Sequence, residues 1–143
     1  MELVLLLHIS QYDENLARFR STCFENSGDG TGISVFERQC AEETSGSICA
    51  HARAYYSSVA NEPPVFWTFD EVILPNGYFL EEVPSDTGDD CHRNIEGLSD
   101  NRAKKFFKKQ ENPLFRICDG NDAQLLTHEG IQHELDKYKQ SLR

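Results

Sequence analysis

Residues 63–74, "PPVFWTFDEVIL", decide the fold class, because they hold the strongest strand pattern in the chain. Val65, Trp67 and Phe69 fall on one face of an extended segment, and the residues between them fall on the other. The high content of β-branched and aromatic residues favours a strand, and the two prolines mark its start. The segment therefore predicts a strand of the central sheet.

The next apolar run follows this strand closely. A turn sequence, "PNG" at 75–77, separates it from "YFLEEV" at 78–83. Short separations with turn residues are typical of hairpins. We expect 65–74 and 78–83 to pair as an antiparallel hairpin.

The N-terminal part predicts a strand and then a helix. Residues 3–9 form an unbroken apolar run of strand length, which predicts a buried first strand. Residues 13–24 predict a helix, with Asp13 as the N-cap and a flexible loop after it at 26–32. The apolar stripe of that helix would consist of Leu16, Phe19, Cys23 and Phe24.

The remaining segments complete an α+β order. Further predicted elements are a strand at 33–36, a helix at about 47–59 with Val59 on its apolar face, a helix capped by Ser99, a strand at 114–119, and a final helix that begins at Asp122 or Thr127. Strands and helices do not alternate strictly, so we predict α+β: one compact domain over 1–143, with a mixed or antiparallel sheet and about four helices.

The charge balance limits the partners. The formal net charge is -10 and the pI is near 4.9, which disfavours generic binding to nucleic acid or to an anionic membrane surface. The one basic cluster is "NRAKKFFKKQ" at 101–110. We interpret it as the solvated face of a helix that packs through Ala103, Phe106 and Phe107; the alternative is a docking site for an anionic partner.

The chain start and the cysteines indicate a compartment. The apolar run at 3–7 has no basic region before it, which is unlike a signal peptide, and no stretch approaches the roughly 20 apolar residues of a membrane span. The five cysteines lack the spacing of a disulfide framework. A cytoplasmic protein with reduced cysteines is therefore expected.

The stretch "THEGIQHELDK" at 127–137 resembles a zinc-protease motif at first sight. That motif needs histidines four apart on a helix, whereas His128 and His133 are five apart and thus about 140° apart around the axis. Gln132 stands where the second histidine would be required. Both histidines are predicted to be surface or capping residues.

Cysteine and histidine side chains offer a second site. The candidates are Cys40, Cys49, His51, Cys91 and His92. None of them has the two-residue gap of a zinc ribbon, so buried thiols are the expected state. A metal or thiol site at Cys91 and His92 is the alternative, although the acidic loop before it would raise the thiol pKa.

His8 ends the first strand beside a loop, where a histidine is well placed to bind a ligand hydroxyl. It lies within "LLHISQYDENLARF" at 6–19. This stretch resembles the opening of small ADP-ribosyltransferase-like domains, including the DarT toxins and RNA 2′-phosphotransferases. Their first strand ends in histidine and a small hydroxyl residue, followed by an Asn-Leu pair.

The resemblance implies an NAD-binding transferase. His8 and Ser10 would hold the ribose, and Tyr55 or Tyr56 would stack on the nicotinamide. Glu82 would be the catalytic acid, with neighbouring Glu81 as the alternative. Nicotinamide would leave, and ADP-ribose would pass to an unknown acceptor. No metal is expected for this activity.

A non-enzymatic role is the alternative from another class. The excess acid is spread over several segments, among them "LEEVPSDTGDD" at 80–90. An acidic surface of this kind steers association with a basic protein partner. The sequence therefore leaves a transferase, an acidic interaction module and a cysteine-histidine site as three hypotheses.

Overall fold

The computed structural model describes residues 1–25, 32–56, 63–111 and 113–142 of the chain. They form a single α+β fold, which confirms the predicted fold class. Its main sheet has seven strands in the order β6-β7-β4-β1-β5-β8-β9. The strands of the sheet are β1 (Glu2–Leu7), β4 (Ile33–Glu37), β5 (Val65–Asp70), β6 (Phe79–Glu82), β7 (His92–Glu96), β8 (Phe115–Asp119) and β9 (Asp122–Leu125). The helices are α1 (Arg38–Ser45), α2 (Ile48–Tyr56), α3 (Asp100–Lys108) and α4 (His128–Ser141).

Strand β1 lies at the centre of the sheet and is buried on both faces. It pairs antiparallel with β4 on one side and, along its whole length, with β5 on the other. Leu3, Leu5 and Leu7 enter one hydrophobic cluster, whereas Val4 enters a second one. An unbroken apolar run is what a strand between two packed faces requires.

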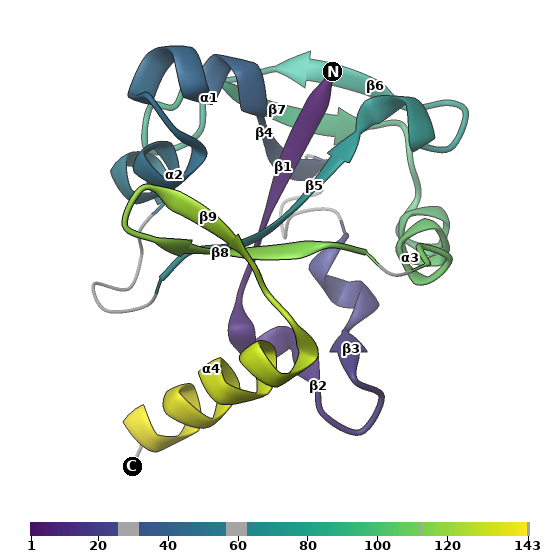
Figure 1. Cartoon of the computed structure of the whole chain (residues 1–143). Coiled ribbons are helices and arrows are strands. Elements are labelled where there is room, and N and C mark those ends of the chain that lie inside the picture. The colour runs from purple at the N-terminus through teal and green to yellow at the C-terminus, as the bar shows by residue number, and fades with distance from the viewer. Residues whose placement is uncertain (26–31, 57–62, 112, 143) are drawn as a thin grey trace.

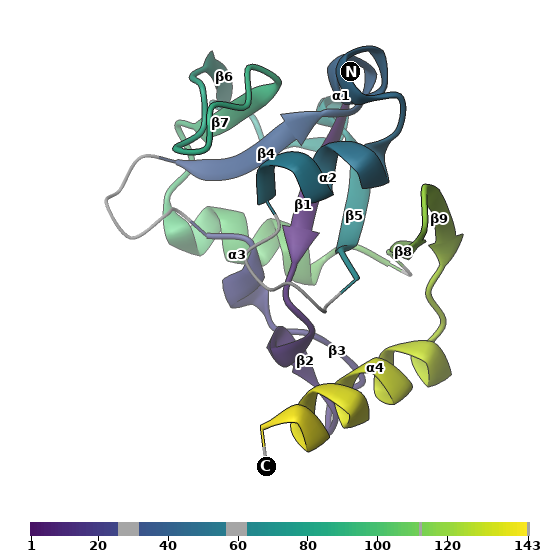
Figure 2. The same ribbon diagram turned by 90° about the vertical axis from the view of Figure 1, so that its left-hand side faces the viewer.

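The two clusters define two different faces of the molecule. The first contains the aromatic side chains Trp67, Phe106 and Phe115, and α3 and α4 contribute to it. The second is smaller and contains Phe36 and Phe66 beneath α1 and α2. In both overall views α1 and α4 lie at opposite ends of the molecule (Figures 1 and 2).

The predicted hairpin of 65–74 with 78–83 is wrong. Strand β5 ends at Asp70, whose side chain accepts a hydrogen bond from the Val72 amide and caps a 3-10 turn at Glu71–Ile73. Strand β6 then pairs with β7 at the far edge of the sheet, and β5 pairs with β1 and β8. After the turn, the chain therefore crosses to the far edge of the sheet and does not fold back beside β5.

The predicted helix at 13–24 is also wrong. Tyr12–Asp13 (β2) and Arg18–Phe19 (β3) form a small hairpin, and a 3-10 turn follows at Ser21–Cys23. The Asp13 carboxylate accepts hydrogen bonds from the amides of Asn15 and Leu16, so the expected N-cap holds a turn. Ala17 has φ 51°, which no helix can contain.

Helices α2, α3 and α4 agree with the sequence, whereas α1 was not among the four predicted helices. Ser99 caps α3, and Thr127 caps α4, so the final helix begins at the later of its two predicted starts. Residues from Asp122 form β9 instead, a strand that the sequence analysis missed together with β7. Residues 26–31 of the loop predicted at 26–32, and Val59, lie outside the described residues.

The prediction of reduced cysteines is wrong. One disulfide joins Cys40 in α1 to Cys91 before β7, and the other joins Cys49 in α2 to Cys118 in β8. Cys23 is the free cysteine. Both bridges connect a helix on the second cluster to the sheet beneath it, so cysteines far apart in sequence meet only in the fold.

None of the described helices is long and apolar enough to span a membrane.

Candidate functional site

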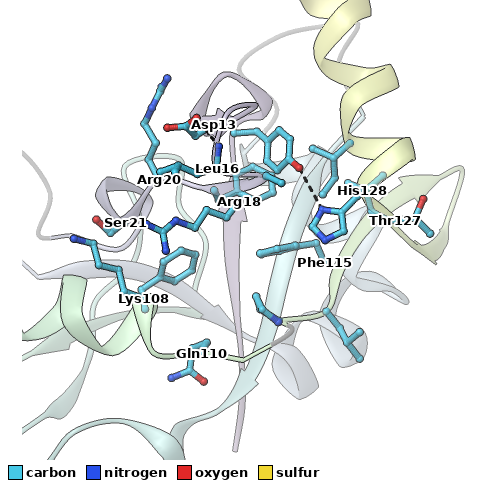
Figure 3. A pocket seen from close by; sticks show the side chains of 18 of the residues that line it. Asp13, Leu16, Arg18, Arg20, Ser21, Lys108, Gln110, Phe115, Thr127 and His128 are labelled. Carbon is cyan, nitrogen blue, oxygen red and sulfur yellow. Dashed lines mark hydrogen bonds between the residues drawn. The ribbon is translucent and has the colours of Figure 1, made fainter.

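A cleft of about 740 Å³ opens beside the β2–β3 hairpin (Figure 3). Its walls come from this hairpin, the end of α3, strand β8 and the start of α4. A volume of this size suits a drug-sized or metabolite-sized molecule. Four segments far apart in sequence thus converge on one concave surface.

The hairpin forms the wall opposite α4. The turn bonds of Asp13 and the left-handed backbone at Ala17 fix the loop between the two short strands. The buried Phe19 side chain then points to the core, where its ring meets that of Phe115 edge-on at 4.8 Å. The wall is thereby anchored to the sheet through an aromatic contact.

The apolar lining continues to the rim. Phe19, Phe107, Phe115, Leu126 and Ile131 line the cleft with buried side chains. Leu16, Leu114 and Leu125 also line it, yet these side chains are 59%, 60% and 54% exposed. Grouped exposed leucines around a concave surface are a feature of ligand or partner sites.

A tyrosine and a histidine meet within the cleft. The hydroxyl of Tyr12 and Nδ1 of His128 are 3.2 Å apart. Burial, and secondarily the charge of Glu14, raises the pKa of Tyr12, so the hydroxyl stays protonated and can donate to the ring. Thr127 caps α4 and so places His128 at the first position of the helix, which orients the ring toward the cleft.

The charged lining is mainly basic. Arg18, Arg20 and Lys108 line the cleft with exposed side chains, and Asp13 is the one carboxylate among its lining residues. Within the described ranges, none of the three cations forms a salt bridge, whereas Asp13 already accepts two backbone amides. In Figure 3 Arg20 and Lys108 lie toward one end of the cleft and His128 toward the other. A chain of net charge -10 therefore has a locally positive cleft.

No known protein family, curated protein or solved structure matched this chain.

His8 and Ser10 lie together in one short turn after β1. His8 caps the 3-10 turn at Ile9–Gln11, with Nδ1 2.5 Å from the Ser10 hydroxyl. The His8 ring also contacts Tyr138 of α4 edge-on at 5.3 Å. The two residues thus form a local cap between β1 and α4.

The predicted tyrosines lie on the other side of the sheet. Tyr56 stacks on Phe36 of the second cluster, and its hydroxyl donates to Asp89 Oδ2. The Tyr55 ring lies 4.8 Å from that of His51. The His8 side chain instead contacts Ser10 and Tyr138.

Glu81 and Glu82 lie on the edge strand β6, separated from β1 by β7 and β4. The Glu82 carboxylate is 80% exposed and lies 3.7 Å from Arg93. Glu82 pairs with Arg93 of β7, and Arg93 pairs with Val35 of β4. The residues of β4 that follow Val35 pair with the start of β1. His8 follows the opposite end of β1, so the structure does not bring Glu82 to it.

A buried polar network accompanies the disulfide on the second face. His51 and Asp89 are both fully buried, and His51 Nε2 lies 2.8 Å from Asp89 Oδ1. Ser45 Oγ lies 2.8 Å from His51 Nδ1, and the Cys91 amide donates to Asp89 Oδ1 at 2.8 Å. Desolvation, followed by the hydrogen bond and charge of Asp89, raises the pKa of Tyr56. The sequence analysis missed this network.

The sequence does contain one indication of this buried network. His51 lies on the apolar face of α2 beside Ile48 and Ala52, and a histidine at such a position needs a buried partner. Strands β5 and β6 lie between His51 and Asp89 in the sequence, so the sequence alone did not reveal which residue that partner would be.

Cys91 and His92 do not form a shared site. Cys91 is in the disulfide with Cys40, while His92 Nε2 lies 2.7 Å from the Ser34 hydroxyl and His92 Nδ1 lies 2.6 Å from the Val83 carbonyl oxygen. Cys91 lies in the turn before β7, whereas His92 is the first residue of that strand, and the two side chains have different partners.

Proposed function

We propose that this protein is a binding module whose cleft takes a small amphipathic anion, with an apolar body and a carboxylate head. The observation that carries the proposal is the convergence of Leu16, Leu114 and Leu125 on a cleft whose cations form no salt bridge with any described residue. Exposed leucines are stabilised when a ligand covers them, at roughly 25 cal/mol per Å² of apolar surface removed from water.

The charge pattern supports a small anion over a polyanion. Arg18, Arg20 and Lys108 attract an anionic head at short range. The net charge of -10 repels a long nucleic acid at greater range. The hydroxyl of Tyr12 and the ring of His128 add hydrogen-bonding groups that can orient the head.

The two disulfides support action in an oxidising compartment. Structural disulfides persist outside the cytosol and are rare inside it. Four of the five cysteines are in these disulfides, which does not suit the expected cytoplasmic protein with reduced cysteines. We therefore propose an extracytosolic setting, which thiol titration of the protein isolated without reductant would check.

The transferase hypothesis stays an untested prediction. Its nominated residues are distributed between the 3-10 turn after β1, helix α2 and the edge strand β6, and the cleft beside the β2–β3 hairpin is lined by none of them. The acidic interaction hypothesis likewise remains open for the surface around β6. We favour the cleft because it combines exposed leucines with cations that form no salt bridge among the described residues.

Calorimetric titration with octanoate, octan-1-ol and octylammonium tests the proposal, because the three share one apolar tail. We expect octanoate to bind about 10-fold tighter than the alcohol, since each exposed charge contact is worth about 0.2–1 kcal/mol. Octylammonium should bind weakest. Equal affinity for the three would contradict an anion site.

Two charge-reversal variants test whether octanoate binds in the cleft. Arg18→Glu should weaken octanoate about 10-fold, whereas Lys105→Glu, an exposed α3 charge outside the cleft, should leave it unchanged. Equal losses in both variants would mean that overall charge, and not the cleft, governs binding.

A further inference from the structure

The buried network on the face opposite the cleft groups side chains that can bind a metal ion. Ligand atoms of His51, Asp89 and Cys91 lie within 4.8 Å of one another, and all three residues are buried. Imidazole, carboxylate and thiolate are the ligand types of zinc in proteins. The Cys40–Cys91 disulfide occupies the thiolate in the present state.

We propose that reduction of the Cys40–Cys91 disulfide converts this network into a zinc site. His51 Nε2, Asp89 Oδ1 and the Cys91 thiolate are the ligands, and Cys40, bonded to Cys91 in the oxidised state, supplies the fourth. The protein thus exchanges a covalent bridge for a metal bridge between the same segments, α1 and the start of β7.

The outer groups of the network already have the arrangement that zinc ligands need. The Ser45 hydroxyl holds His51 at Nδ1 and leaves Nε2 directed inward. The Tyr56 hydroxyl binds Asp89 at Oδ2 and leaves Oδ1 directed toward the same point. Outer partners of this kind fix the tautomer and orientation of metal ligands.

Zinc binding requires only a small increase in the distance between His51 Nε2 and Asp89 Oδ1. His51 Nε2 and Asp89 Oδ1 are 2.8 Å apart and now share a proton. Zinc bonds of about 2.0–2.1 Å to nitrogen and oxygen place two tetrahedral ligand atoms slightly more than 3 Å apart. The ion would therefore replace the shared proton, while sulfur ligands stand about 2.3 Å from the metal.

The chemistry balances with a low-molecular-weight thiol as the reductant. Two thiol molecules give two electrons and two protons to the disulfide, form their own disulfide, and leave Cys40 and Cys91 as thiols. Cys40 is the partly exposed sulfur and is therefore the one attacked. Zinc then displaces the two thiol protons, and the imidazole proton moves from Nε2 to Nδ1, where it faces Ser45.

The two disulfides provide a matched pair of variants for the test. Cys40→Ser leaves the Cys91 thiol beside His51 and Asp89, whereas Cys118→Ser leaves the Cys49 thiol elsewhere in the same cluster. Each variant loses one bridge between a helix and the sheet, and each keeps Cys23. Only Cys40→Ser should bind one zinc ion without reductant.

Cobalt titration gives a readout beyond stoichiometry. Cys40→Ser should show the near-ultraviolet thiolate-to-cobalt band and the visible bands of a tetrahedral ion, and zinc should displace it. Wild-type protein should show these signals only after reduction. Adding Tyr56→Phe to Cys40→Ser should weaken zinc binding about 10-fold, as loss of an outer partner does.

Three results would overturn the proposal: equal binding by Cys40→Ser and Cys118→Ser, binding that survives His51→Gln in the Cys40→Ser background, or a cobalt spectrum without the thiolate band. If Cys40→Ser is unfolded without metal, circular dichroism takes the place of the titration. Zinc-dependent recovery of helix would then support the site, because binding and folding are coupled, and absence of recovery would refute it.

Discussion

The two faces of the sheet differ in what their polar groups do. On the face beneath α1 and α2, His51 and Asp89 are fully buried and satisfy each other, and two disulfides fasten the helices down. At the cleft, Arg18 and Lys108 are exposed and have no ion-pair partner in the described ranges. Satisfied buried groups stabilise a fold, whereas unsatisfied groups around a cavity are available to a ligand.

The largest expected effect is on the buried face. Asp89→Ala should lower the free energy of unfolding by about 3–5 kcal/mol, because it leaves His51 and the Tyr56 hydroxyl buried without their partner. Chemical denaturation measures the loss. Asp90→Ala, next to it and exposed, should stay within about 0.5 kcal/mol of wild type. If both variants lost only a little free energy of unfolding, the buried network would not stabilise its face of the sheet as described.

Loss of one disulfide should have the next largest effect. The Cys49–Cys118 bridge closes a 69-residue separation, and the double variant Cys49→Ala with Cys118→Ala should lose about 4 kcal/mol through greater unfolded-state entropy. Thermal and denaturant unfolding without reductant measure it. Octanoate affinity at a temperature where the variant is folded should not change, because neither cysteine lines the cleft.

Tyr56→Phe should cost about 1–3 kcal/mol and also alter the pH dependence. The fold raises the pKa of Tyr56 above its ordinary value near 10, through burial and then Asp89. A raised pKa stabilises the fold fully below pH ~10, and this contribution is lost as the pH rises further. Wild type should therefore lose stability above pH ~10 more steeply than Tyr56→Phe.

The comparison of wild type with Tyr56→Phe at alkaline pH requires that Cys23 be replaced in both proteins. Burial also raises the pKa of Cys23, to about 12, so that thiol contributes in an overlapping pH range. Measuring both proteins with Cys23→Ala isolates the tyrosine. Parallel stability curves above pH ~10 would contradict a buried Tyr56–Asp89 contact.

The smallest effect on stability should come from the cleft rim, where the effect on binding is large. Leu125→Asp should change the free energy of unfolding by no more than about 0.5 kcal/mol, because the side chain is already 54% exposed. Octanoate affinity should nevertheless fall at least about 10-fold, since a carboxylate replaces apolar contact and repels the ligand. Val72→Asp, 78% exposed outside the cleft, is the matched control.

Local patterns predicted most of the elements but not their pairing. The apolar run of β1, the alternation in β5 and the capping residues Ser99 and Thr127 each act within a few residues, and the corresponding elements formed. The hairpin prediction failed because the cap at Asp70 ends β5 before the turn sequence is reached. Pairing partners depend on side chains that are distant in sequence.

The candidate sites were harder to predict for the same reason. The spacing of Leu16, Phe19 and Phe24 suits a helix, but the turn at Asp13 and the left-handed Ala17 produced a hairpin that faces the cleft. The cysteines have no framework spacing because each bridge spans more than 50 residues. Only the folded chain brings these groups together.

A nuclear magnetic resonance titration of isotope-labelled protein with octanoate tests the central claim most directly, because it locates binding residue by residue. Saturable shift changes should concentrate at 12–21, 107–115 and 125–131, the segments that line the cleft, and should be absent from α1 and α2. Changes centred on α1 and α2, or none that saturate, would contradict the assignment of binding to the cleft and stability to the opposite face.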